Sequence, residues 1–261
     1  MARIWQITAY LNYLRKRKTR YHVHSPFVYE LVDKVFKDKK RYKEYRELNR
    51  LRKKFIQRSD KVEIMDFGTG AGNKDYLIRV KRVGDIVRQS GHSKKQLELL
   101  FRLARYFKPE TILEFGTSVG VSTTYLSKGY PPAKMITMEG SMGLTTIANE
   151  TFKKHNLGIE VEVGEFGAIL DEVIKNTQKL DMVFFDGNHR KKPTLEYFNK
   201  CMKCVHEDSV FMFDDIHWSR GMNKAWEKIK KDKRVSLTID LYWIGLVFFR
   251  KGVAKQNFIL Y

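Results

Sequence analysis

The sequence predicts an α/β fold in which a mostly parallel sheet follows an N-terminal helical extension and ends in an antiparallel hairpin. Strand-like and helix-like segments alternate between residues 111 and 231, and such alternation is typical of parallel strands joined by right-handed helical crossovers. A glycine-containing turn follows the first of these strands, as in nucleotide-binding α/β sheets. The last two strand-like runs, residues 235–241 and 244–250, lie close enough in sequence to pair as a hairpin.

The first 60 residues form the predicted basic extension. Residues 3–18 and 40–58 have amphipathic helical patterns, and Ser25 followed by Pro26 is typical of a helix start between them. This segment holds 18 Lys and Arg against 6 Asp and Glu, within a chain whose formal charge is +20. A surface of this kind favours polyanions or anionic membranes, although a solvated basic face explains the same composition.

Residues 61–92 are predicted to be a connecting segment, and residues 93–261 the main domain. The run VEIMDFGTGAG at residues 62–72 looks like a strand followed by a glycine-rich turn. No second strand ending in an acid follows it, so we interpret it as a glycine-rich loop near the mouth of the site. Ser93 and Gln96 form a capping-box pattern that predicts a helix reaching Phe107.

Five strands of the main domain are expected to end at one edge of the sheet, where ligands bind in open α/β folds. They are residues 111–116, 134–139, 159–163, 180–186 and 209–214. The intervening helices are expected at residues 120–128, 143–155, 166–177, 192–205 and 221–231.

The turn after the first strand points to a nucleoside. Gly116 and Gly120 let the backbone approach a ligand closely, and Glu139 ends the next strand, where an acid can accept both ribose hydroxyls. The turn lacks the G-x-G-x-x-G spacing that brings a helix N-terminus onto a pyrophosphate, which disfavours a dinucleotide. A nucleoside without phosphate suits the site better, and S-adenosylmethionine (SAM) is the common one.

The run LEFGTSVGVS at residues 113–122 resembles the first motif of class I SAM-dependent methyltransferases, in the form of the catechol O-methyltransferase-like branch. The likeness continues at residues 139–140, 164–166, 186–189 and 214–215, and covers roughly residues 90–250. It implies a Rossmann-like methyltransferase sheet. The cofactor-binding residues that we expect are Glu114, Gly116, Ser118, Ser122, Glu139 and Glu165, with Glu139 on the ribose, Glu114 by the methionine portion and Glu165 near the adenine.

Three acids at strand ends predict a metal site. Asp186, Asp214 and Asp215 would repel one another at the edge of the sheet unless a cation lay between them, and oxygen ligands suit Mg²⁺ or Ca²⁺. In the resembled enzymes a divalent ion occupies this place, often with an asparagine at the third position. The alternative is that Asp186 or Asp215 caps a helix or contacts the amine of the cofactor.

The expected chemistry is direct displacement of the methyl group by an aligned, deprotonated nucleophile. A metal bound by Asp186 would lower the pKa of a substrate hydroxyl. His189 stands three residues after Asp186, where the resembled catechol-type enzymes place a lysine base, so we predict His189 as the general base. Asn188 and His217 are the other candidates, and a structural histidine is the alternative.

The sequence therefore predicts a SAM-dependent, metal-assisted O-methyltransferase acting on a hydroxylated small molecule. The first alternative is a tRNA or rRNA methyltransferase that uses the basic extension, and the second is a SAM-binding module without turnover. Cys201 and Cys204 are too few for a disulfide framework. With no signal-peptide pattern and no membrane-spanning run, we expect a cytoplasmic protein, and a homodimer is compatible with the sequence.

Overall fold

The computed structural model describes residues 2–67, 76–89 and 91–261. These residues form two compact units, residues 1–29 with 170–261 and residues 30–169, and each unit is described by itself. The predicted glycine-rich loop falls largely on residues 68–75 and lies outside the described residues. The predicted division of the chain at residues 60 and 92 stays a prediction.

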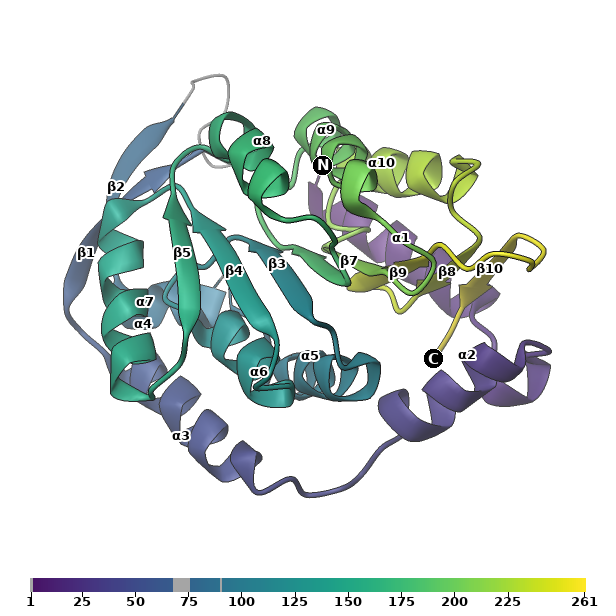
Figure 1. Cartoon of the computed structure of the whole chain (residues 1–261), viewed down its shortest axis with the longest axis horizontal. Helices are drawn as coiled ribbons and strands as arrows, with labels where there is room; N and C mark the ends of the chain where they lie inside the picture. Colours follow the sequence, from purple (N-terminus) through teal and green to yellow (C-terminus); the bar gives the residue numbers. More distant parts are fainter. Residues whose placement is uncertain (1, 68–75, 90) are drawn as a thin grey trace. The chain divides into compact units, whose positions relative to one another are not determined.

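The unit of residues 30–169 contains three parallel strands: β3 (Thr111–Phe115), β4 (Lys134–Glu139) and β5 (Ile159–Val163). Strand β4 is the middle strand, paired with β3 on one side and β5 on the other. Two helices make the crossovers, α6 (Val121–Gly129) and α7 (Met142–Lys154). Helix α7 lies beside β5, as Figure 1 shows. All three strands match their predicted ranges to within a residue.

Helix α5 (Lys94–Phe107) begins at the predicted capping box. Ser93 N–H donates to Gln96 Oε1 at 2.7 Å, and Gln96 N–H donates to Ser93 Oγ at 3.4 Å. The helix ends at Lys108, whose left-handed φ of 49° closes it. Its buried face carries five large apolar side chains, Leu97, Leu99, Leu100, Phe101 and Leu103, and it packs closely on α6.

The segment before α5 contains more regular structure than the connecting segment that we predicted. A π-helical turn (Val32–Phe36) and helix α3 (Glu44–Gln57) lead into an antiparallel hairpin of β1 (Lys61–Asp66) and β2 (Leu77–Arg82), followed by α4 (Val83–Gln89). The predicted strand at residue 62 is confirmed, and β2 was missed. Charged residues alternate with apolar ones along β2, Arg79 and Lys81 among them, as is typical of a strand with one solvated face.

The second unit is built on five strands in the order β10-β8-β9-β7-β6. Strand β6 (Met182–Phe185) runs parallel to β7 (Val210–Asp214), and β7 pairs antiparallel with β9 (Ile244–Phe248). Strands β9 and β8 (Leu237–Asp240) form the predicted hairpin. Strand β10 (Gln256–Ile259), which we did not predict, runs parallel to β8.

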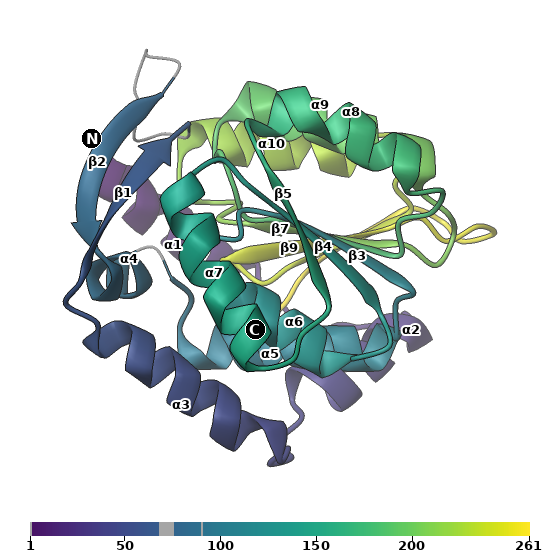
Figure 2. The same ribbon diagram turned by 60° about the vertical axis from the view of Figure 1, so that its left-hand side comes forward.

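Helices α9 (Lys191–Cys201) and α10 (Arg220–Lys231) pack on each other and lie on the same side of these strands in Figure 2. A 3-10 turn (Met202–Cys204) follows α9, and α8 (Phe166–Asn176) precedes β6. Trp226 on α10 is 1% exposed and packs against Gly245 on β9. A Cβ at Gly245 would approach the Trp226 ring to 2.6 Å, so only glycine fits there.

Helix α1 (Ala2–Lys16) lies beside the segments that follow β7 and β10 in the same unit. The indole N–H of Trp5 donates to the carbonyl of His217 at 3.3 Å, after β7. The hydroxyl of Tyr13 donates to the carbonyl of Leu260 at 2.6 Å, after β10. The chain continues through a 3-10 turn (Arg20–His22) to α2 (Pro26–Leu31), which begins at the predicted proline. Among the described residues, no helix combines the length and apolarity needed to span a bilayer.

Candidate functional site

The turn between β3 and α6 is held tightly against β4. The N–H groups of Gly116 and Thr117 both donate to the carbonyl of Met138, at 2.9 and 3.1 Å. Gly120 stands at the N-cap of α6 with φ 82°, and a Cβ there would approach the Phe152 ring to 2.6 Å. Gly116 has φ 98°. Both glycines are therefore required by the backbone, and the turn brings a helix N-terminus to the edge of the sheet.

Glu139 lies directly against this turn. Its Oε2 accepts a hydrogen bond from the N–H of Ser118 at 2.8 Å, and its Oε1 accepts one from the N–H of Ser141 at 2.9 Å. The side chain is 8% exposed, and burial raises the pKa of its carboxyl group. Each carboxylate oxygen keeps further acceptor capacity beyond its backbone bond, as recognition of paired hydroxyls requires.

Glu114 lies deeper, in a cluster of threonines. Its Oε2 accepts hydrogen bonds from the hydroxyls of Thr123 and Thr137, at 2.5 and 2.8 Å, and Thr137 also bonds Thr117. The side chain is fully buried, and burial raises the pKa of its carboxyl group. Its Oε1 is buried without a hydrogen-bond partner among the residues that the structure describes. Glu114 thus ties β3 to both β4 and α6 and leaves one acceptor free.

Two other expected cofactor residues, Glu165 and Ser122, lie in or next to the first turns of helices. Glu165 Oε2 accepts a hydrogen bond from the N–H of Ala168 at 2.9 Å in the first turn of α8. The ring of Phe166, next in sequence, meets Phe115 edge-on, with the ring centroids 5.7 Å apart. Ser122 is 7% exposed in the first turn of α6. The carboxylate of Glu165 therefore stabilises a helix start, and its predicted role at the adenine stays a prediction.

The β1 hairpin brings a residue to this site that sequence reasoning missed. Phe67 lies against Gly140, immediately after Glu139, and a Cβ on Gly140 would approach the Phe67 ring to 2.6 Å. Ser141 Oγ accepts a hydrogen bond from the N–H of Met65 at 3.2 Å, which fixes the end of β1. The sequence contained one indication of this contact: Gly140, directly after Glu139, has no side chain and so leaves room for an aromatic ring.

The second unit gathers the predicted carboxylates at the ends of β6 and β7. Phe185 and Phe213 are paired in register, so Asp186 and Asp214 follow at adjacent positions. Potential ligand atoms of His189, Asp214 and Asp215 all lie within 4.8 Å of one another. His189 Nε2 is also 3.8 Å from Asp186 Oδ1. The structure therefore groups the predicted base with the predicted metal ligands, and one imidazole and two carboxylates can bind a divalent cation.

The other two candidates for the base have different surroundings. His217 is held between Asn223 Oδ1 and Asp240 Oδ2, both at 2.8 Å, and its ring stacks on Tyr242. That network fixes the ring of His217 in the loop after β7, and its alternative role as the base stays a prediction. Asn188 adopts a left-handed φ of 50°, and its Oδ1 is buried with no hydrogen-bond partner in the part of the chain that the structure describes.

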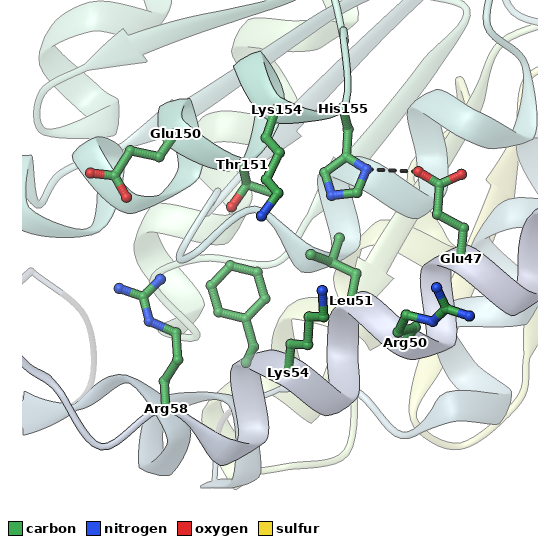
Figure 3. Close-up of a pocket in the computed structure, with 10 residues that line it drawn as sticks. Glu47, Arg50, Leu51, Lys54, Arg58, Glu150, Thr151, Lys154 and His155 are labelled. Carbon is green, nitrogen blue, oxygen red and sulfur yellow. Dashed lines mark hydrogen bonds and ion pairs between the residues drawn. The ribbon is translucent and has the colours of Figure 1, made fainter.

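A cavity of about 360 Å³ lies elsewhere in the first unit, between α3 and the C-terminal end of α7 (Figure 3). Its polar lining is mostly basic: Arg50, Lys54, Arg58 and Lys154 surround it together with the ion pair of Glu47 and His155. None of the predicted site residues lines this cavity. It is therefore separate from the glycine turn and Glu139.

Comparison with known proteins agrees with this arrangement. Residues 113–216 match a family model described as a methyltransferase domain. A catechol O-methyltransferase of Niastella koreensis is 26% identical over 128 residues, which are 48% of this chain and 57% of that protein. The match thus spans less than two thirds of the relative.

Solved structures extend the likeness in fold. The O-methyltransferase from Bacillus cereus, in complex with S-adenosylhomocysteine (SAH), superimposes with a TM-score of 0.55 at 19% identity, covering 84% of this chain and 94% of that one. The O-methyltransferase TomG from Streptomyces achromogenes, in complex with SAM, gives a TM-score of 0.54 at 23% identity, covering 62% and 82%. These similarities confirm the predicted fold class. Residues 113–216 are thus similar to a methyltransferase domain, and the fold of the chain is similar to that of solved O-methyltransferases.

Proposed function

We propose that this protein transfers the methyl group of SAM to a hydroxyl group of a small molecule, assisted by a divalent cation. The observation that carries the proposal is the position of Glu139, whose carboxylate accepts hydrogen bonds from the N–H of Ser118, in the glycine turn after β3, and from the N–H of Ser141, after β4. A buried carboxylate beside a glycine-containing turn has the hydrogen-bond acceptors that ribose hydroxyls need. The O-methyltransferases that share the fold include proteins solved with SAM and with SAH.

The residues present fit this cofactor. Gly116 and Gly120 remove the side chain at two positions of the turn, and Phe67 beside Gly140 places an aromatic ring next to the ribose acid. The uncommitted Oε1 of Glu114 supplies a further buried acceptor behind the turn. We assign the ribose to Glu139 and the cofactor-binding surface to Gly116, Ser118, Ser122 and Glu165.

The donor set at β6 and β7 fits a divalent cation. Asp186, Asp214 and Asp215 would hold it, with carboxylate oxygens of the kind that Mg²⁺ and Ca²⁺ prefer. Carboxylate oxygens also suit Mn²⁺, which makes it a third candidate. We place His189 beside the ion and not among its ligands, because a ring nitrogen bound to the cation could not accept a proton. When bound, the ion would lower the pKa of an acceptor hydroxyl.

His189 is the residue that we assign to proton transfer. Asp186 lies 3.8 Å from its Nε2 and stabilises the protonated ring electrostatically. In the reaction, the acceptor oxygen forms a bond to the methyl carbon and the pair of electrons of the S–C bond remains on sulfur. The hydroxyl proton passes to His189, and SAH is the second product.

Isothermal titration with SAH tests the cofactor assignment independently of the acceptor. We expect binding by the full chain and its loss in Glu139→Ala. Absence of SAH binding by the folded wild-type protein would contradict the proposal. Binding without turnover of any hydroxylated acceptor would favour the alternative of a SAM-binding module.

A panel of catechol-like and other hydroxylated acceptors, assayed for SAH formation with and without chelator, tests the metal. Asp186→Asn should abolish the metal-dependent activity, whereas Asp181→Asn, at the opposite end of β6 and paired with His206, should retain it. Activity that survives both chelator and Asp186→Asn would remove the cation from the mechanism. The RNA partner, the homodimer and the cytoplasmic location stay predictions.

A further inference from the structure

Helix α1 presents apolar side chains on two opposite faces. The inner face packs on its own unit through Trp5, Ala9 and Tyr13, which are spaced four residues apart. The outer face carries Ile4, Ile7 and Leu11, which are 70%, 61% and 59% exposed. Their spacing of three and four residues places them in one stripe along the helix. We call Ile4, Ile7 and Leu11 the outer stripe.

The charged residues close to the outer stripe in sequence have one sign. Residues 1–29 contain six Lys and Arg, Arg3, Arg15, Lys16, Arg17, Lys18 and Arg20, and the first acid of the chain is Glu30. Residues 15–18 are exposed and follow the stripe directly at the end of α1. On a helical wheel, Arg15 falls beside Ile4 and Leu11, because eleven residues make about three whole turns. Arg15 therefore shares the face of the outer stripe, and residues 16–18 continue the basic cluster at and beyond the end of α1.

We propose that α1 docks this protein on an anionic phospholipid surface, with the outer stripe inserted among the acyl chains and residues 15–18 on the headgroups. Peripheral membrane helices combine these two features, aliphatic side chains on one face and flanking Lys or Arg. Neither feature alone gives stable attachment.

The chemistry of the surface favours lipid over two other occupants. Association of two copies through the outer stripe would bring two clusters of four cations together without an acid from residues 1–29 to offset them. Nucleic acid would neutralise the charge, and its bases could stack on Tyr10 and Tyr21, which are exposed. It offers no apolar surface, however, to cover the three aliphatic side chains of the outer stripe. An anionic bilayer satisfies both the aliphatic stripe and the positive charge.

The docking helix is also joined to the carboxylate site of its own unit. Trp5 and Gln6 donate hydrogen bonds to the backbone carbonyls of His217 and Trp218, each at 3.3 Å, just beyond Asp214 and Asp215. A membrane-bound α1 would therefore hold this loop close to the lipid surface.

Vesicle co-sedimentation with the full chain tests the proposal. Vesicles of phosphatidylcholine alone are compared with vesicles containing one quarter phosphatidylserine. We expect binding to the anionic vesicles, weakening as salt is raised, and little binding to neutral ones. The double variant Ile7→Gln and Leu11→Gln should weaken binding at least tenfold, because glutamine keeps the helix and removes the aliphatic surface.

The matched control is Ile78→Gln with Val80→Gln, two exposed aliphatic residues of β2 in the other unit, which should bind as wild type. Arg15→Gln with Lys16→Gln should weaken binding by about fivefold per charge removed. Equal binding by the Ile7 and Leu11 variant and wild type would overturn the proposal, as would equal binding to neutral vesicles. A wild-type dimer that the same variant converts to a monomer, with no vesicle binding, would instead make the outer stripe a contact between copies.

Discussion

Replacing Glu139 by glutamine removes one charge from the proposed ribose site and leaves the shape of the side chain unchanged. In the structure Glu139 accepts hydrogen bonds from two backbone N–H groups, of Ser118 and Ser141. Hydrogen bonds to a charged acceptor contribute about 1 kcal/mol more than neutral ones. Two ribose hydroxyls would therefore bind more weakly by about 2 kcal/mol, roughly a 30-fold rise in the Kd for SAH.

Titration calorimetry at pH 8 and low temperature measures this change on folded protein. Glutamine has a single carbonyl oxygen, so one of the two backbone N–H groups loses its acceptor and the free energy of unfolding should fall by about 1–3 kcal/mol. A melting curve of each variant therefore accompanies the titration. The control is Glu160→Gln, the same change at an exposed residue of β5 paired with Lys134, which should bind SAH as wild type.

Lowering the pH should mimic the substitution in wild type. Burial raises the pKa of Glu139, so affinity for SAH should decline at a pH above the ordinary range of glutamate, and the Glu139→Gln variant should lack this dependence. An SAH affinity in that variant within threefold of wild type at pH 8 would refute the assignment of the ribose to Glu139.

Three further predictions concern other parts of the chain. Asp215→Gly removes a proposed metal ligand, and glycine adopts the φ of 54° at this position without strain. The rise in Tm that Mg²⁺ or Mn²⁺ produces should therefore disappear, and the metal-free Tm should not fall. An unchanged metal response would exclude Asp215 as a ligand. Because burial raises the pKa of Glu114, its favourable contribution is present below the unfolded pKa of about 4.3 and is lost as pH rises through the folded value. Urea unfolding between pH 4 and 8 should therefore show wild type losing stability relative to Glu114→Gln as pH rises, and a constant difference would contradict this. Tyr13→Phe leaves the carbonyl of Leu260 without its 2.6 Å hydrogen bond. The free energy of unfolding, measured by urea denaturation, should fall by about 1–2 kcal/mol. A loss below about 0.3 kcal/mol would show that water replaces the hydroxyl.

The parts of the fold that could be predicted are those where local chemistry and the global arrangement agree. Buried parallel strands are continuous apolar runs, so β3 and β4 could be predicted from the sequence. The acid at the end of each apolar run identified the carboxyl end of the strand. The capping box at Ser93 is a purely local signal, and the structure confirms it. The hairpin of β8 and β9 likewise follows from two apolar runs separated by a short turn.

The parts that could not be predicted depend on distant partners. Strand β10 is four largely exposed or half-buried residues, and it becomes a strand only because β8 offers a free edge. The approach of Phe67 to Gly140 depends on the β1 hairpin, because the two residues are over 70 positions apart in sequence. His189 was predicted to lie near the carboxylates, but its position among the ligand atoms of Asp214 and Asp215 depends on tertiary backbone geometry.

Three residues after strand ends share an unusual backbone: Ser118, Asn188 and Asp215 all have φ near 50° without being glycine. The left-handed region is costly for side chains branched at Cβ and tolerable for Asn and Asp. Descendants of this sequence can therefore exchange these residues only among a few small or polar types without disturbing the turns. If Ser118 and Asp215 hold the cofactor and the metal as we propose, a change of acceptor during evolution would have to come from surrounding segments, because these two positions accept few other amino acids.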